Sequence, residues 1–184
     1  MRWSDICVQG VDLSLSATGL VTIRDGHAWV ETIHTDSTWT ETRRRRHIAR
    51  RVYAALGDVR PAVVAVEEPI HGISNKTTIQ LASLHGVVRD HLWRPGIAVT
   101  DVHLSRLKVF GAGGGRASKD EMLRAAREQL TPYLGWAQDD NQADAMWLAC
   151  MGLLHVGQLP FPASGRQRTI VQSLTWPNVE GVHT

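Results

Sequence analysis

Two short apolar runs in this chain each end on a single carboxylate, and no other feature of the sequence restricts the fold more. Asp12 follows the run at residues 6–11, and Glu67 follows the run at residues 62–66. Runs of this length predict buried strands, which hold their last side chains rigidly. A third carboxylate, Asp144, opens a stripe with helical spacing that continues through Trp147, Leu148 and Met151. Because buried acids need compensation and divalent metal supplies it, we predict a metal-dependent active site.

The rest of the chain alternates between strand and helix patterns. Asp25-Gly26 between two apolar runs is a strong hairpin signal, and it predicts that the first three strands form an antiparallel meander. Strands are expected at residues 6–13, 17–24, 27–34, 62–67 and 96–100. Helices are expected at residues 39–57, 74–93, 105–110, 118–131 and 138–155. This order predicts an α/β fold with a mixed five-stranded sheet, three antiparallel strands followed by parallel ones, and helices on both faces.

The length of 184 residues suits one domain with a substantial core. We assign residues 1–158 to this domain and residues 159–184 to a proline-containing extension that is packed on the surface or partly mobile. No apolar run approaches the roughly 20 residues that cross a bilayer, and no secretory signal pattern opens the chain, so a cytoplasmic protein without membrane contact is expected. Both cysteines are interpreted as core residues, because no Cys/His pattern has zinc-ligand spacing.

Positive charge is concentrated rather than large. The net charge is +2, yet seven arginines lie between residues 38 and 60, and the chain has 17 arginines against 3 lysines. Arginine suits phosphate recognition, but the same bias also arises from a GC-rich genome. The alternative for the arginine group at residues 43–51 is a solvated outer helix face.

The three carboxylates have the spacing needed to meet. Alternation along neighbouring strands puts Asp12 and Glu67 on matching faces, and Asp140 lies one helical turn before Asp144. Asp139 is interpreted as a helix cap and Glu68 as a surface residue, and Asp140 is either a ligand or a surface acid. Oxygen ligands favour hard cations, so we expect two Mg²⁺ or Mn²⁺ ions per site, the usual apparatus of phosphodiester hydrolysis.

Several motifs occur in a familiar order. They are the segments at residues 10–19, 64–67 and 142–145, joined by residues 81–86 and by the stretch from Leu107-Lys108 to Ser118-Lys119. Together they resemble the RuvC-type Holliday junction resolvases of the RNase H-like superfamily, from about residue 6 to residue 154. The resemblance implies a homodimeric, Mg²⁺- or Mn²⁺-dependent nuclease that cuts four-way DNA junctions by paired nicks. It also implies metal ligands at Asp12, Glu67 and Asp144, and Lys108 and Lys119 beside the scissile phosphate. For such a DNA substrate, the further phosphate contacts that we expect are Lys76, Arg89, Arg116 and part of the arginine group at residues 43–51.

Two positions depart from the family's pattern. Asn141 stands where the family often has an acid or a histidine, so either its carbonyl or Asp140 would complete the metal site. Ile70 stands where an aromatic wedge is common, and an apolar wedge that opens base pairs remains feasible there. Flaps, forks and other branched DNA therefore stay open as substrates. The helix at residues 74–93 is the expected dimer surface, although its stripe of Leu84, Val88 and Leu92 would equally serve as core.

Two further function classes are weaker. A non-catalytic junction-binding protein would not need the intact acids. An actin-like ATPase or sugar kinase would share the opening hairpin, but it needs a longer two-domain chain. The glycine-rich loop at residues 111–115 also lacks a following Lys-Ser/Thr, so no nucleotide cofactor is expected. The sequence leaves open whether a bacterium or a bacteriophage encodes the chain.

Overall fold

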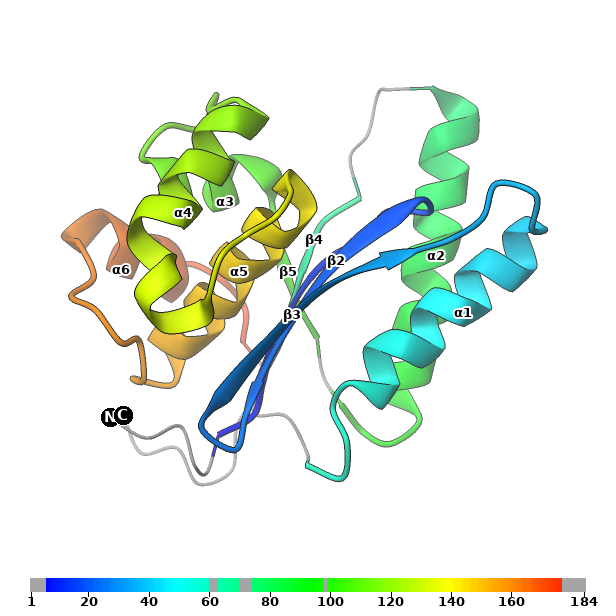
Figure 1. Cartoon of the computed structure of the whole chain (residues 1–184), viewed down its shortest axis with the longest axis horizontal. Coiled ribbons are helices and arrows are strands. Elements are labelled where there is room, and N and C mark those ends of the chain that lie inside the picture. Colours follow the sequence, from blue (N-terminus) through cyan, green and yellow to red (C-terminus); the bar gives the residue numbers. More distant parts are fainter. Residues whose placement is uncertain (1–5, 60–62, 70–73, 98, 177–184) are drawn as a thin grey trace.

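A mixed five-stranded sheet with helices on both faces forms the centre of the protein in a computed structural model (Figure 1). The structure describes residues 6–59, 63–69, 74–97 and 99–176. The strands are β1 (Val8–Asp12), β2 (Ala17–Arg24), β3 (His27–His34), β4 (Val63–Glu67) and β5 (Val99–Val102). The helices are α1 (Glu41–Ala54), α2 (Asn75–Trp93), α3 (Leu104–Ala112), α4 (Lys119–Leu134), α5 (Asp140–His155) and α6 (Gly165–Gln172). The predicted fold class is confirmed.

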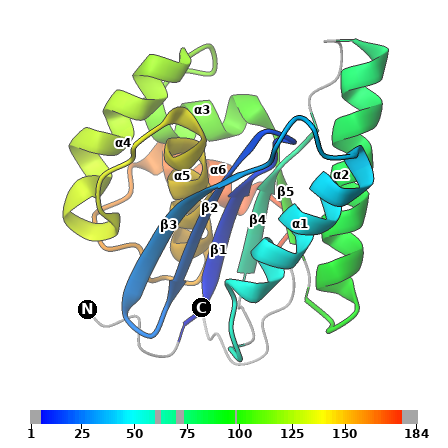
Figure 2. The same cartoon turned by 45° about the vertical axis from the view of Figure 1, so that its right-hand side comes forward.

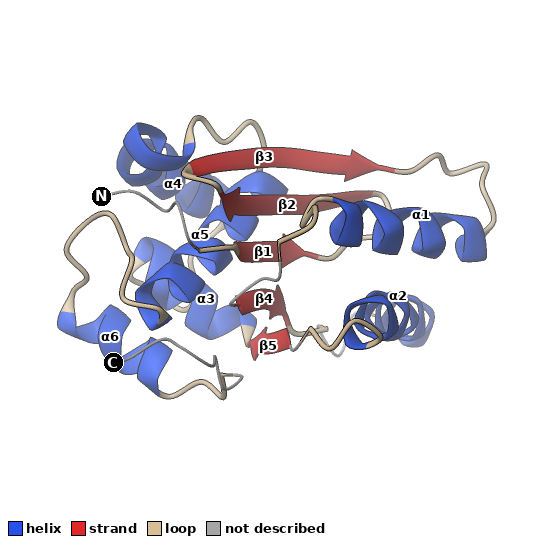
Figure 3. Ribbon diagram, turned by 90° about the horizontal axis from the view of Figure 1, so that it is seen from below, coloured by secondary structure: helices blue, strands red, loops and turns tan. Residues whose placement is uncertain are grey.

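The sheet has an antiparallel half and a parallel half. Its order is β3-β2-β1-β4-β5, which can be followed strand by strand in Figure 3. β2 and β3 are joined by the predicted hairpin, where Asp25 (φ 50°) and Gly26 (φ 77°) both take the left-handed backbone that a tight turn requires. β1 pairs antiparallel with β2 and parallel with β4. β1 is therefore central, and its last residue lies where the two halves of the sheet join.

The fifth strand begins three residues later than the sequence pattern predicts. We predicted residues 96–100, but β5 is Val99–Val102. Gly96 takes a left-handed conformation (φ 77°) after α2, and the backbone N–H of Ile97 donates to the carbonyl of Leu92. Ile97 is thus buried in the turn that ends α2 and not in a strand. Its apolar side chain is the reason why the strand was predicted to begin too early.

Each face of the sheet has its own hydrophobic core. On one face α5 lies between the sheet and the outer helices α3, α4 and α6; α1 and α2 cover the other face (Figures 1 and 2). α5 is buried along most of its length, whereas α1 and α2 each expose one side. The apolar stripe of α2 is core, because Leu84, Val88 and Leu92 are at most 1% exposed. Of the two interpretations of this stripe, core or dimer surface, core is therefore confirmed, and the role of α2 as a dimer surface stays a prediction.

The chain after α5 includes a helix that the sequence analysis missed. α6 begins at a capping box in which Ser164 and Gln167 satisfy each other's backbone N–H groups. Val171 is buried, and the indole N–H of Trp176 donates to its carbonyl at 2.7 Å. The division of the chain at residue 158 stays a prediction. Within the described ranges, no helix combines the length and apolar character needed to span a bilayer.

Candidate active site at the carboxyl edge of the sheet

Asp12 and Glu67 end neighbouring parallel strands. β1 and β4 run in register, with Val11 opposite Val66, so the two acids follow at the same edge of the sheet. Glu67 is only 8% exposed, and Asp12 is partly buried. Asp12 shares its face with Val8, and Glu67 shares its face with Val63, both of which pack in the core beneath α5. The strands thus direct both carboxylates toward the α5 side, as alternation predicted.

Two glycines let α5 approach this edge closely. Gly19 pairs with Asp12 across the β1–β2 ladder, and a Cβ at Gly19 would collide with the backbone carbonyl of Asn141. A Cβ at Gly10 would collide in the same way with the carbonyl of Ala145. Larger residues at either position would lift the helix away from the strands. The start of α5, which carries Asp140 and, one turn later, Asp144, therefore lies directly over the strand position occupied by Asp12.

A polar network fixes the start of α5 against β3. Asp139 caps the helix by accepting a hydrogen bond from the backbone N–H of Gln142 at 2.8 Å, as predicted for this residue. Its other carboxylate oxygen accepts from the hydroxyl of Thr32 at 2.7 Å, and the Gln142 side-chain amide donates to the same hydroxyl at 3.1 Å. The sequence analysis missed Thr32 and Gln142, because their partners lie more than 100 residues apart. The network positions the helix turn that carries the acids.

The carboxylates are close enough to raise one another's pKa values. Burial, followed by repulsion from Glu67 and Asp144, raises the pKa of Asp12 well above its usual range. Burial and then repulsion from Asp144 raise the pKa of Glu67 to about 7, and burial with repulsion from Asp140 raises the pKa of Asp144 to about 6. Such a cluster binds protons more tightly than isolated carboxylates do, and bound cations would displace these protons.

The donor set fits a divalent metal. Within the described ranges, Oδ1 of Asp144 is buried and accepts no hydrogen bond, and a native fold rarely leaves a buried carboxylate oxygen in that state. Asp140 instead forms an ion pair with Lys119. No three His, Cys, Asp or Glu side chains among the described residues are already arranged as a metal-binding group. Mutual repulsion and an unpartnered oxygen are nevertheless what hard cations with oxygen ligands would relieve.

Both predicted lysines interact electrostatically with these acids. Lys108, on α3, and Lys119, at the start of α4, lower the pKa values of Glu67 and Asp144 and so partly oppose the repulsion. The hydrogen bond with Asp140 is the main reason why the pKa of Lys119 is raised. Two of the chain's three lysines therefore flank the site from one side, while the catalytic and metal-binding roles of these residues stay predictions.

A cavity of about 70 Å³ adjoins the two strand ends on the α2 side. Asp12 and Glu67 line it together with Leu13, Glu68, Pro69, Leu81 and His85. Burial lowers the pKa of His85 to about 4, so the ring is neutral, and its Nδ1 has no partner among the described residues. The sequence analysis took Glu68 for a surface residue and gave His85 no role beyond its place in the family-like segment at residues 81–86. A polar residue on the core side of α2 was the available signal.

The predicted DNA-binding residues fall into three groups. Lys76 is exposed at the first turn of α2, and Arg116 is exposed in the loop before α4. Arg89 forms an ion pair with Asp101 at the edge strand, so its charge is already partnered. Ile70, the predicted wedge, lies outside the described residues. Lys76 and Arg116 therefore have accessible charges, whereas the charge of Arg89 is paired.

Most of the arginines on α1 contact this protein's own groups. Arg43 stacks over Trp39 at 4.0 Å from the ring, and Arg44 donates to the carbonyl of Leu15 at 2.9 Å. Arg45 pairs with Glu41, and Arg51 pairs with Glu31. These contacts favour the interpretation of α1 as a solvated outer helix over that of a DNA-binding surface.

Comparison with known proteins shows which family shares this arrangement. No family model matches the chain. A protein named crossover junction endodeoxyribonuclease RuvC from Anaeromyxobacter dehalogenans (strain 2CP-C) is 33% identical over 117 residues, which are 62% of this chain and 60% of that protein. The chain thus spans under two thirds of that relative. The protein of the same name from Synechococcus sp. (strain WH7803) is 32% identical over 123 residues, which are 65% of this chain and 77% of that protein.

A solved structure agrees with the sequence relatives. It is titled Thermus thermophilus RuvC in complex with Holliday junction substrate, and it superposes with a TM-score of 0.64 at 25% identity. The superposition covers 78% of this chain and 90% of that one. With relatives of more than 30% identity covered over three quarters of their length and a shared fold, this chain belongs to the RuvC family of crossover junction endodeoxyribonucleases.

Proposed function

We propose that this protein is a divalent-metal-dependent endonuclease that resolves four-way DNA junctions by paired nicks. The observation that carries the proposal is the meeting of Asp12 and Glu67, at adjacent strand ends, with Asp144 from a helix that two glycines admit to the same edge. The raised pKa values of all three acids support their assignment as ligands of a shared metal centre. The relatives named crossover junction endodeoxyribonuclease RuvC support the reaction class.

The ligand set that we propose is Asp12, Glu67 and Asp144, with Asp140 as a fourth ligand when Lys119 releases it. When bound, two Mg²⁺ or Mn²⁺ ions would lower the pKa of an attacking water and stabilise the leaving oxygen. The rigid strands β1 and β4 hold Asp12 and Glu67 in place, and the Thr32–Asp139–Gln142 network holds the helix turn of Asp144. The protein therefore supplies a preorganised acidic edge that needs little rearrangement around the cations.

Lys108 and Lys119 would bind the phosphate that enters this edge. Both ammonium groups already interact with the buried carboxylates, so a phosphodiester placed between them and the acids would meet positive charge on one side. Lys119 would have a second role, because the carboxylate of its ion-pair partner Asp140 would bind either the lysine or a cation. We propose that phosphate entry draws Lys119 away from Asp140 and so frees the carboxylate for metal.

We also propose that the protein acts as a homodimer through the outer side of α2. This side exposes Ile79 (65%) and Trp93 (75%), with the small exposed residues Ala82 and Gly86 between them. Sedimentation velocity of the wild type should give a dimer, and Ile79→Asp should shift it toward monomer. A monomeric wild type at micromolar concentration would contradict the dimer. Because its substrate would be cellular DNA, we place the protein in the cytoplasm of a bacterial cell or of one infected by a bacteriophage.

The activity is tested by offering labelled four-way junctions, flaps, forks and linear duplexes side by side with Mg²⁺ or Mn²⁺. Symmetric nicks in opposite strands of the four-way junction, absent in EDTA, are the expected result. If only flaps or forks are cut, they are the substrate in place of the four-way junction, and the proposed metal site still stands. Binding without cleavage under all these conditions would favour the non-catalytic alternative.

A further inference from the structure

The surface where α6 packs on α3 contains two arginines without an acidic partner. Arg106 of α3 donates to the backbone carbonyl of Ser173 at 3.3 Å, and Arg166 of α6 donates to the carbonyl of Gly113 at 3.0 Å. Both residues are exposed. Among the described residues neither takes part in an ion pair. Each guanidinium therefore keeps its full charge and most of its five N–H donors.

Both arginines line one hollow, and Arg166 also borders a neighbouring hollow that contains Glu121 and Glu128. The pocket is about 390 Å³ and is lined by Ser105, Arg106, Val109, Arg166, Thr169 and Ile170. Its lining has two guanidinium groups, two hydroxyls and two apolar side chains, but no carboxylate. A phosphodiester with its attached sugar presents matching chemistry, because charged oxygens suit the arginines and the sugar carbons suit the apolar walls.

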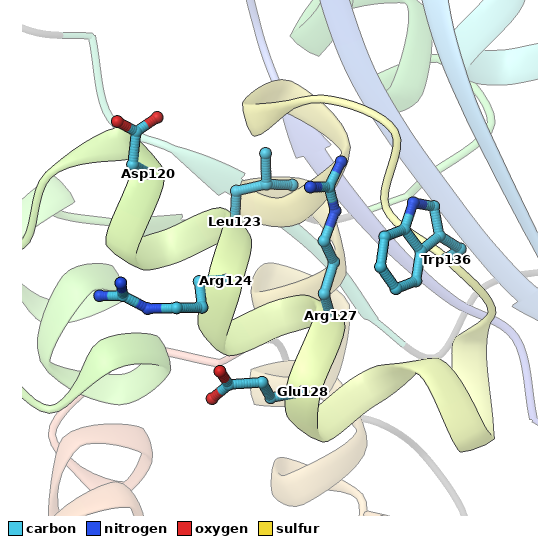
Figure 4. A pocket seen from close by; sticks show the side chains of 6 residues that line it. All are labelled: Asp120, Leu123, Arg124, Arg127, Glu128 and Trp136. Atoms are coloured by element: carbon cyan, nitrogen blue, oxygen red, sulfur yellow. The ribbon is translucent and has the colours of Figure 1, made fainter.

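A second arginine-containing hollow on α4 shows by contrast why the acid-free lining matters. There Arg127 stacks over Trp136 at 4.6 Å from the ring, but Asp120 and Glu128 lie at the ends of the same hollow (Figure 4). Arg127 also donates to the carbonyls of Ala137 and Gln138, so it is engaged in holding the loop before α5. Two carboxylates at its rim would repel a DNA backbone.

The α3–α6 pocket lies close to the candidate active site through α3 itself. Arg106 precedes Lys108 by two residues, so their side chains leave the helix about 200° apart. Lys108 faces the acids, and Arg106 faces α6, which lies beside α3 in Figure 3. A helix with its side chains is about 10–12 Å across, so DNA that reaches Lys108 has Arg106 within one helix diameter. Arg166 is tied to Gly113, in the loop that leads to Arg116 and Lys119.

We propose that the α3–α6 pocket binds a backbone phosphate of a DNA arm that leaves the candidate active site. The inference rests on the proposed function, because it supplies a second anchoring point for the same branched substrate. It also gives the segment after α5 a function in addition to its packing against α3. The capping box at Ser164 and the hydrogen bond from the Gln167 side chain to the carbonyl of Phe110 at 2.9 Å hold α6 in register for that task.

Thr169→Asp tests the pocket without removing any bond that docks α6. The new carboxylate lines the pocket beside Arg106 and Arg166, so it should pair with them and exclude phosphate. Gln172→Asp is the matched control, because residue 172 is exposed on the same helix but does not line the pocket. Binding of a fluorescent four-way junction is measured by anisotropy in EDTA between 50 and 300 mM salt, with thermal unfolding of each variant alongside.

Thr169→Asp should weaken binding about tenfold and reduce the slope of log affinity against log salt by about 1 to 2, as expected when two phosphate-facing charges are neutralised. Gln172→Asp should stay within about twofold of the wild type, because its added charge is screened. The double variant Arg106→Gln with Arg166→Gln keeps side-chain N–H donors for the carbonyls of Ser173 and Gly113. Its slope of log affinity against log salt should fall by the same amount as that of Thr169→Asp.

Equal slopes for Thr169→Asp and Gln172→Asp would overturn the pocket as a phosphate site. That result is distinguishable from failure of the proposed function, because the wild type would still bind and cut the junction. If the wild type neither binds nor cuts any branched DNA, the proposed function fails, and the pocket fails with it as a DNA site.

Discussion

The arginine-rich helix α1 and the carboxyl edge of the sheet are both rich in charged side chains, but the fold treats these charges in opposite ways. On α1, Arg43, Arg45 and Arg51 each meet an aromatic ring or an acid of the same chain. At the carboxyl edge, like charges are brought together, and one oxygen of Asp144 has no hydrogen-bond partner among the described residues. Density of charge in the sequence is thus a weaker guide to function than charge that the fold leaves uncompensated.

The largest effect should come from removing an uncompensated acid. Asp144→Asn should lower Mg²⁺-dependent junction cleavage by at least about 10³-fold, because it removes one of the proposed ligands of a cation pair that would stabilise the transition state. The double change Asp12→Ala with Glu67→Ala should abolish nicking while junction binding persists. Rates are measured under single-turnover conditions on a labelled four-way junction.

Glu128→Gln, an exposed acid on α4, is the control and should cut at the wild-type rate. The metal-free Asp144→Asn protein should also unfold at a higher temperature than the wild type, because repulsion within the cluster is relieved. Cleavage by Asp144→Asn at a tenth of the wild-type rate or more would contradict the assignment.

Metal-free stability should depend on pH through the same cluster. The pKa of Glu67 is about 7 in the folded protein against an ordinary value of 4.5. The native state therefore binds more protons than the unfolded chain between these values, and this group's contribution to stability falls as pH rises through that window. The shift corresponds to about 3 kcal/mol. His85 acts in the opposite direction between about pH 4 and 6.5, because burial lowers its pKa.

A comparison of Glu67→Gln with the wild type separates the contribution of Glu67 to the pH dependence of stability from that of His85. In EDTA, the free energy of unfolding of the variant should exceed that of the wild type by an amount that grows from pH 4.5 to pH 7.5. Saturating Mg²⁺ should remove this advantage by stabilising the wild type alone. Urea titrations at several pH values provide the measurement, and an advantage that stays constant with pH would refute the raised pKa.

The close approach of α5 to the sheet comes next in size. Gly19→Ala should destabilise the fold by about 1–3 kcal/mol or more, because its methyl group collides with backbone rather than with a flexible side chain. Cleavage should fall as well, since the turn that carries Asp144 must move. Gly114→Ala is the control, because no atom lies within 4 Å of its added Cβ, and it should change stability by less than about 0.5 kcal/mol. Equal stabilities would show that α5 is held less tightly than its packing indicates.

Local patterns predicted the elements well where one residue type has one use. Asp25-Gly26 predicted the hairpin, and apolar alternation predicted the strand ends that carry Asp12 and Glu67. The pattern failed where one residue type has two uses. Leu84 on α2 fits a core or an interface equally well in the sequence, and Ile97 fits a strand or a buried turn. The capping box at Ser164 was readable, but it lies among prolines and was passed over.

The candidate site was predictable as a list of acids but not as an environment. Which acids repel one another depends on how closely α5 packs over Gly19. This packing brings Gly19 against Asn141, more than 100 positions away in the sequence. The same holds for charges that turn out to be partnered. Arg51 meets Glu31 from another strand, and Arg89 meets Asp101 across the edge of the sheet. Residue type suggested DNA binding for both arginines, and only the fold reveals their partners.

The smallest effect should come from α1, and it tests the other side of the comparison. Changing Arg43, Arg45 and Arg51 together to Gln should alter the salt dependence of junction binding by less than about 0.5 in slope, because these charges are already engaged. Stability should fall by no more than about 1 kcal/mol, since the ion pairs are exposed. Changing Lys76 and Arg116 together to Gln should reduce the slope by about 1.8, because both are exposed and neither forms an ion pair in the described part of the chain. If the α1 variant loses as much slope as the second one, internal partners do not prevent arginines from binding DNA, and α1 belongs to the DNA-binding surface.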